Sequence, residues 1–140
     1  MNLVTHRYIV LFGQTDGWWA KYLPGYTHVC LMEIVGDDYV IVVDPSMHGV
    51  SMGIRWLPDK EEANYEMLYV RVRARKKNRL IGFRFQTCAT VVQYLMNTDL
   101  GAITAQGLYK RLTGCSPGWL RKRGIIGVRQ WELKRAQQSA

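Results

Sequence analysis

The sequence predicts an α+β fold, in which helices pack on a mainly antiparallel sheet. Two observations carry this prediction. The first part of the chain holds short apolar or alternating segments separated by turns rich in Gly, Pro and Asp, a pattern typical of antiparallel strands. From residue 88 onward, apolar residues instead recur at helical spacing. The length of 140 residues and the hydrophobic share of 48% suit a single domain over 1–140, with a basic C-terminal extension from about 119.

The predicted strands of the first half follow from their patterns. Residues 8–12 form a continuous apolar run, which predicts a buried strand. Residues 27–35 and 39–44 predict a hairpin closed by a Gly-Asp-Asp turn. Residues 66–75 alternate between apolar side chains and Tyr or Arg, which predicts a strand with one buried face. The remaining segments predict a Trp-containing loop over 13–26, a second loop over 44–53, and a short strand or connector over 53–57.

The second half predicts two helices. Cys88 begins the first, whose apolar face consists of Cys88, Val91, Val92, Leu95 and Met96. Residues 103–112 predict a second, shorter helix. The other segments predict a turn over 76–79, a short strand over 80–85, a break over 116–124, a short strand over 125–128 and a frayed polar end.

Cys88 is a candidate nucleophile because of where it lies in the predicted helix. Thr87 is a favourable N-cap, so Cys88 occupies the first helical position. There the free amides and the helix dipole favour an anion and lower a thiol pKa. Gln86, directly upstream, offers a side-chain donor near the same place. The alternative is that Cys88 is a small core residue on the apolar face of its helix.

A nucleophilic cysteine needs a base, and His28 and Asp44 are the candidates for base and orienting carboxylate. His28 shares its strand face with Cys30, Met32 and Ile34. A three-residue hairpin loop over 35–37 places Asp44 opposite His28, and a loop over 36–38 places it opposite Cys30 and diagonal to His28. Both registers keep Asp44 on the histidine's face, whereas a two-residue loop would not. The alternatives are a structural histidine and an ordinary turn aspartate before Pro45.

The order of these residues resembles the circularly permuted papain-like hydrolases, which include the permuted NlpC-like peptidases and the lecithin:retinol acyltransferase group. The likeness lies in TDGWWAKYLPGYTHVCLM, YVIVVDPS and QTCATVVQYLMNTDLGAITAQGLYKRL, which fall within about residues 8–113. The first and last stretches also resemble small proteins of phages and prophages. The resemblance implies a permuted papain-like arrangement of the fold, without a cofactor. It also implies that Cys88 attacks a carbonyl, that His28 acts as base, and that Asp44 orients it.

The same resemblance suggests the substrate. The acyltransferase branch carries an Asn-Cys pair where this chain has Thr87-Cys88, which favours an amide or peptide bond over a lipid. Trp18 and Trp19 are candidates for the wall of a substrate cleft, or else one of them anchors its loop on the core. His48 is a rival base or a solvated loop histidine.

The cysteines and the N-terminal residues indicate the cellular compartment and whether a metal cofactor is expected. Cys30, Cys88 and Cys115 predict reduced thiols, and no close Cys or His pair has zinc-ligand spacing, so no metal is expected. No signal peptide or apolar stretch of spanning length is evident, so we expect a location in the cytoplasm of a host cell or in a virion.

The competing function class is a basic nucleic-acid-binding module. Nineteen Lys and Arg against eleven Asp and Glu leave a formal charge of +8, which favours an anionic partner. Arg71, Arg73 and Arg75 form a stripe beside Tyr69 on one predicted strand. The chain has no RNP pattern, zinc-finger spacing or helix-turn-helix, and a solvated, edge-protecting face is the other reading of the stripe. A catalytically inactive phage structural or assembly protein is a third alternative.

Overall fold

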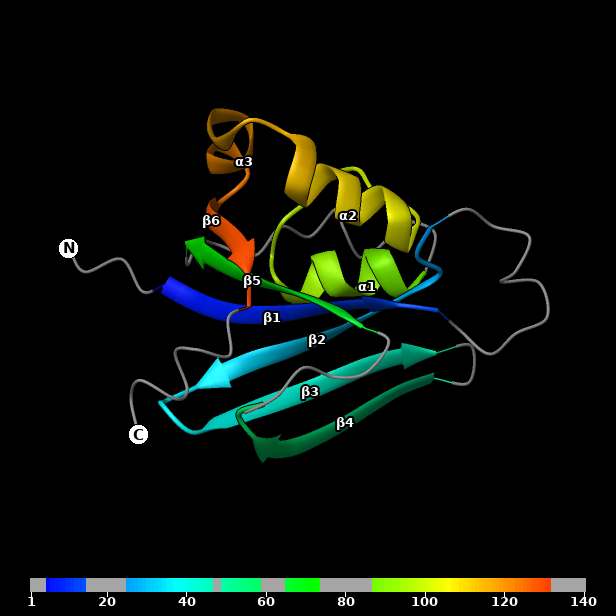
Figure 1. Ribbon diagram of the computed structural model, residues 1–140, viewed down its shortest axis with the longest axis vertical. Coiled ribbons are helices and arrows are strands. Elements are labelled where there is room, and N and C mark those ends of the chain that lie inside the picture. The colour runs from blue at the N-terminus through cyan, green and yellow to red at the C-terminus, as the bar shows by residue number, and fades with distance from the viewer. Residues whose placement is uncertain (1–4, 15–24, 47–48, 59–64, 74–86, 132–140) are drawn as a thin grey trace.

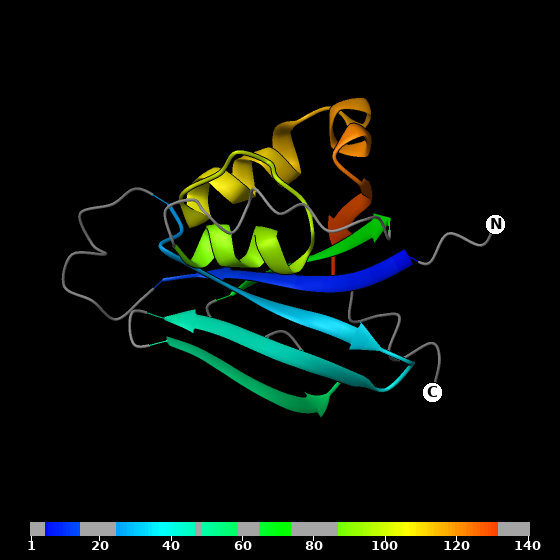
Figure 2. The same cartoon turned by 180° about the vertical axis from the view of Figure 1, so that it is seen from behind.

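Three helices lie on one side of a six-stranded antiparallel sheet (Figures 1 and 2). The structure is a computed structural model and describes residues 5–14, 25–46, 49–58, 65–73 and 87–131. The strand order is β4-β3-β2-β1-β5-β6. The strands are β1 (Thr5–Gly13), β2 (His28–Val35), β3 (Tyr39–Ser46), β4 (Gly49–Trp56), β5 (Glu66–Arg73) and β6 (Ile125–Gln130). The α+β class with an antiparallel sheet is confirmed.

The N-terminal strands follow their sequence patterns, with one correction. The apolar run at 8–12 is the centre of β1, which pairs with β2 from Tyr8↔Glu33 to Gly13↔His28, and the alternating segment forms β5. The loop expected over 44–53 is wrong in part, because β4 begins at Gly49 and pairs with β3 from Tyr39↔Trp56 to Ser46↔Gly49. Val50, Met52, Ile54 and Trp56 alternate with Gly, Ser and Arg along β4, so the sequence carried a strand pattern that was missed, although every residue of this strand is exposed. The strand predicted over 80–85 lies outside the described residues.

The helices are α1 (Cys88–Leu95), α2 (Ala105–Gly114) and α3 (Pro117–Lys122). The first two confirm the predicted helices. The break expected over 116–124 is wrong, because a short helix forms there. Ser116 caps it by accepting a hydrogen bond from the backbone N–H of Trp119, and Pro117 stands in the first turn, where a missing N–H costs nothing. The basic C-terminal segment therefore contributes α3 and the edge strand β6.

Each face of the sheet carries a hydrophobic cluster. The helical-face core joins the strands to all three helices through Phe12, Leu31, Val70, Val92, Leu108 and Leu120. The far-face core gathers Ile9, Leu11, Cys30, Met32, Ile34, Val40, Met67 and Tyr69 on the opposite face of the same strands. Both faces of the central strands β1, β2 and β5 are thus buried, and α1 packs on β2 and β3.

The buried side of α1 is rotated from the expected one. Ala89, Val92 and Gln93 are buried, whereas Leu95 is 39% exposed. The reason is Gln93, whose amide bridges α1 and the segment before α2. Its nitrogen donates to the carbonyl oxygens of Ala89 at 3.0 Å and Ala102 at 2.7 Å, and its oxygen accepts the backbone N–H of Leu100 at 2.9 Å. A polar side chain that satisfies buried backbone groups takes the inward position in place of a leucine.

Among the helices described, none is long and apolar enough to cross a bilayer.

Candidate active site

Cys88 stands at the first position of α1, as predicted, and a capping box holds the helix start. The Thr87 hydroxyl accepts the backbone N–H of Thr90 at 3.1 Å, and the Thr90 hydroxyl accepts the backbone N–H of Thr87 at 2.7 Å. The Thr87 hydroxyl also donates to the carbonyl oxygen of Ile103 at 2.6 Å, just before α2. Thr87 is therefore bonded both to the first turn of α1 and to the segment just before α2.

The β2–β3 hairpin brings His28 and Asp44 together. Val35 pairs with Tyr39, so the turn comprises residues 36–38 and the second of the two expected registers is the observed one. The last registered pair is Leu31↔Val43, and the same register places Asp44 opposite Cys30 and diagonal to His28. Nε2 of His28 lies 2.7 Å from Oδ1 of Asp44. The His28 side chain is 15% exposed and that of Asp44 is 49% exposed, so the carboxylate lies on the solvent side of the ring.

The Cys88 sulfur lies against the start of β2 and is surrounded by donors. Burial alone raises the pKa of the Cys88 thiol and is the largest single influence on it. The hydrogen bond with His28, those from the backbone N–H groups of Val29 and Ala89, and the charge of His28 act in the opposite direction. Their combined effect outweighs burial, so the pKa of Cys88 is lowered.

The pKa of His28 is raised, whereas that of its partner Cys88 is lowered. The hydrogen bond with Cys88 is the largest influence and raises the pKa of His28; burial lowers it, and the hydrogen bond and charge of Asp44 raise it further. The net direction is upward. With Nε2 engaged by Asp44, Nδ1 is the ring nitrogen left for the sulfur. The two opposite shifts favour transfer of the thiol proton to the imidazole.

The three groups meet at the end of the sheet rather than on either flat face. Alternation along β2 assigns His28 to the face of Cys30 and Met32, which belong to the far-face core, while α1 packs on the helical face. The contact is made at the first residue of β2, beyond the last β2–β3 pair, where α1 contacts both strands. Cys88 packs against the helical-face core and meets His28 at this end of the sheet.

An aromatic and carboxylate anchor, missed from the sequence, fixes the chain just before His28. The Tyr26 hydroxyl donates to Oε2 of Glu66 at 2.6 Å, and the Tyr109 hydroxyl donates to Oε1 of Glu66 at 2.9 Å. The backbone N–H of Tyr26 donates to Oε1 of Gln106 at 2.8 Å. Gly25, with φ of 76°, leaves the space that the Gln106 amide occupies. The Gly25-Tyr26 pair after Pro24 was the only sequence signal for this anchor.

The remaining candidates fall into two groups. Gln86, Trp18, Trp19, His48 and Arg75 lie outside the described residues. Cys30 is buried in the far-face core and Cys115 packs against the helical-face core, and none of the three cysteines forms a disulfide. Across the part of the chain that the structure describes, no three His, Cys, Asp or Glu side chains converge as metal ligands do.

The fold and the site thus define an α+β protein with a cysteine, a histidine and an aspartate in contact at a helix N-terminus. Comparison with protein families, with curated proteins and with solved structures finds no match for this chain.

Proposed function

We propose that this protein is a thiol hydrolase that cleaves an amide or peptide bond. The observation that carries the proposal is the chain of contacts from the Cys88 sulfur through the His28 ring to the Asp44 carboxylate. A nucleophile in contact with a base, and a base in contact with an orienting carboxylate, is the arrangement that cysteine and serine hydrolases share on unrelated folds.

The reaction uses each group in a defined role. The Cys88 thiolate attacks the carbonyl carbon and forms a C–S bond, while the carbonyl oxygen takes the negative charge. The backbone N–H of Cys88, at the first position of α1, stabilises this oxyanion. Protonated His28 then gives its proton to the leaving nitrogen, and the C–N bond breaks to leave a thioester on Cys88.

The second half of the reaction releases the acid. Neutral His28 takes a proton from water, and the resulting hydroxide attacks the thioester carbonyl. The C–S bond breaks, the carboxylic acid leaves, and the sulfur regains the thiolate form paired with the imidazolium. Asp44 accepts a hydrogen bond from the Nε2–H group of His28 throughout the reaction. This bond keeps Nδ1 turned toward the sulfur.

The substrate class and location rest on the resemblance to permuted papain-like hydrolases. Thr87 in place of an Asn before the cysteine supports an amide rather than a lipid ester. The likeness of the flanking stretches to phage proteins supports a phage-associated role on a peptide, inside a host cell or in a virion.

The test is the pH dependence of Cys88 alkylation by iodoacetamide, followed by peptide mass spectrometry in the wild type and in His28→Ala. We expect an inflection well below the ~8.5 of a free thiol, and a shift to higher pH in the variant. Cys115, which is also half-buried, serves as the reference thiol in each sample. An inflection that is normal in the wild type, or unchanged by His28→Ala, would refute the activated pair and leave Cys88 as a packing residue.

A further inference from the structure

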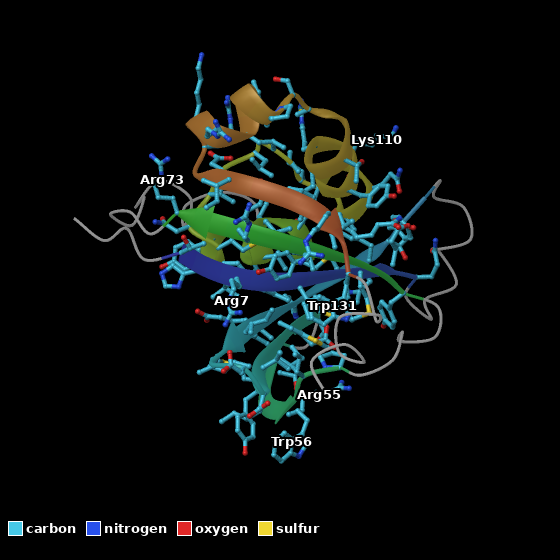
Figure 3. All side chains as sticks on the ribbon, turned by 60° about the vertical axis from the view of Figure 1, so that its left-hand side comes forward. Arg7, Arg55, Trp56, Arg73, Lys110 and Trp131 are labelled. Carbon is cyan, nitrogen blue, oxygen red and sulfur yellow. The ribbon has the colours of Figure 1, made fainter. Side chains whose placement is uncertain are left out.

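An arginine cluster occupies the far face of the sheet, away from the helices. Alternation along β5 puts Arg71 and Arg73 on the face of Tyr69, a member of the far-face core. The register Arg7↔Arg71 adds Arg7 of β1, and the register Tyr69↔Arg129 adds Arg129 of β6. Figure 3 shows the labelled Arg7 and Arg73 toward the same end of their strands. We call Arg7, Arg71, Arg73 and Arg129 the arginine face.

Neutral groups hold three of these side chains in place. An Nη atom of Arg7 donates to the carbonyl oxygen of Gly36 at 2.6 Å. The Arg129 guanidinium lies 4.5 Å from the ring centroid of Tyr69. The Arg71 guanidinium lies over Gly127, where an added Cβ would come within 2.8 Å of one of its nitrogens. Gly127 thus leaves room for a guanidinium to lie flat across β6.

No carboxylate neutralises this charge among the described residues. The two salt bridges there join His6 to Glu33 and His28 to Asp44, and neither involves the arginine face. Asp37 and Asp38 follow Gly36 in the β2–β3 turn and form no ion pair with Arg7. Two like charges directly opposite each other, as in the Arg7↔Arg71 pair, destabilise a sheet unless an anion lies between or above them.

The size and chemistry of the cluster fit a phosphate backbone. Neighbouring strands lie about 4.8 Å apart and alternate residues about 6.8 Å apart, so three strands present the four guanidiniums across about 10 Å. All four are arginines, whose planar fork binds phosphate oxygens in pairs and holds its charge at any physiological pH. A chain of phosphates is the partner that satisfies several such groups at once.

We propose that the arginine face binds the phosphate backbone of duplex nucleic acid. A duplex is favoured over a single strand because single-strand binding depends on exposed aromatic rings for base stacking. The aromatic ring at the centre of this face, Tyr69, is only 9% exposed and is covered by Arg129. The cluster lies on the face opposite the helices and shares no residue with the Cys88 site, so the two activities are independent.

The experiment is fluorescence anisotropy of the wild type with a labelled 20-base-pair DNA duplex of arbitrary sequence, from 50 to 200 mM salt. We expect Arg71→Gln/Arg73→Gln to weaken binding and to reduce the slope of log K against log salt by about 1.8, or about 0.9 for each lost phosphate contact. The matched control, Lys110→Gln/Arg121→Gln, removes two exposed charges from the helices. It should change the slope much less.

Each other outcome overturns the proposal. If the two double variants lose equal duplex affinity and slope, binding depends on net charge and not on the arginine face. Tighter binding of the matching single strand, or of heparin, than of the duplex would assign the face to another polyanion. An absence of duplex binding at 50 mM salt would leave the face solvated. Cys88→Ser should bind the duplex as the wild type does, so this result is separate from the test of the hydrolase.

Discussion

Nε2 of His28 lies 2.7 Å from Oδ1 of Asp44, and this bond joins the first residue of β2 to a residue near the end of β3. The three-residue turn between the strands sets the register that makes the bond diagonal across the hairpin. Cys88, which supplies the thiol, belongs to a helix that begins 60 residues after His28. The site thus combines one local relationship with one that only the packing of α1 creates.

Asp44→Asn should lower the pKa of His28. The Asp44 carboxylate raises that pKa through its hydrogen bond and its charge, and the variant loses the charge while keeping the shape. The imidazolium would therefore lose its proton at a lower pH than in the wild type. NMR titration of the His28 ring measures the shift without any substrate, and a turnover assay would show the alkaline limb of the pH profile moving to lower pH.

Asp38→Asn is the control for that variant, because Asp38 is an exposed carboxylate of the same hairpin. A His28 pKa that stays at its wild-type value in Asp44→Asn would contradict an orienting role for Asp44.

Thr87→Ala should destabilise the protein by about 1 kcal/mol through the lost N-cap and should also slow alkylation of Cys88. The Thr87 hydroxyl accepts the Thr90 N–H and ties the helix start to the carbonyl of Ile103, so its loss lets the first turn move. Chemical denaturation measures the stability, and iodoacetamide reaction at fixed pH measures the thiol.

Thr104→Ala is a closely matched control, since Thr104 caps α2 by accepting the N–H of Gly107 at 2.9 Å. We expect a comparable loss of stability with normal Cys88 reactivity. If both variants slow alkylation equally, the effect of Thr87 is global rather than local.

Gln93→Leu should cost about 2–4 kcal/mol although it makes α1 more apolar. It leaves the N–H of Leu100 and the carbonyl oxygen of Ala102 without their partner in a buried place. Leu95→Gln, on the exposed side of the same helix, should cost less than about 1 kcal/mol. Urea unfolding of the two variants checks the orientation of α1, and the reverse ranking would refute it.

Glu66→Gln should destabilise the protein at neutral pH by about 1 kcal/mol, a value reduced for partial exposure. The hydrogen bond from Tyr26 is the main cause of the lowered pKa of Glu66; burial opposes it, and Tyr109 and Gln130 add to it. The same contact raises the pKa of Tyr26 to about 12. A carboxyl with a lowered folded pKa contributes stability that is present above its unfolded pKa and is lost as the pH falls through its folded pKa.

The difference in unfolding free energy between the wild type and Glu66→Gln should therefore shrink as the solution is acidified through that range. Thermal or urea unfolding from pH 7 to pH 3 measures it, and Tyr26→Phe should show the same trend. A difference that is independent of pH would mean that charge on Glu66 contributes nothing to the anchor.

Local pattern was sufficient for much of the fold and for part of the site. Two apolar segments around the Gly-Asp-Asp turn predicted the β2–β3 hairpin, and helical spacing after Thr87 predicted where α1 begins. These features depend on interactions between residues close in sequence, which a local pattern records. They also placed Cys88 at the start of its helix and kept Asp44 on the side of His28.

Tertiary structure decided what depends on distant partners. Gln93 lies inward because its amide bonds to backbone groups of the segment before α2. The sequence of α1 alone does not indicate these partners. The edge strand β4 is held by backbone pairing with β3 rather than by a buried face, so its alternating Val50, Met52, Ile54 and Trp56 remain exposed. The anchor of Tyr26 on Glu66 and the pairings Arg7↔Arg71 and Tyr69↔Arg129 join segments far apart in the sequence. These contacts depend on the order and register of the strands. Neither can be read from the sequence of a single segment, because both are set by pairing between distant segments.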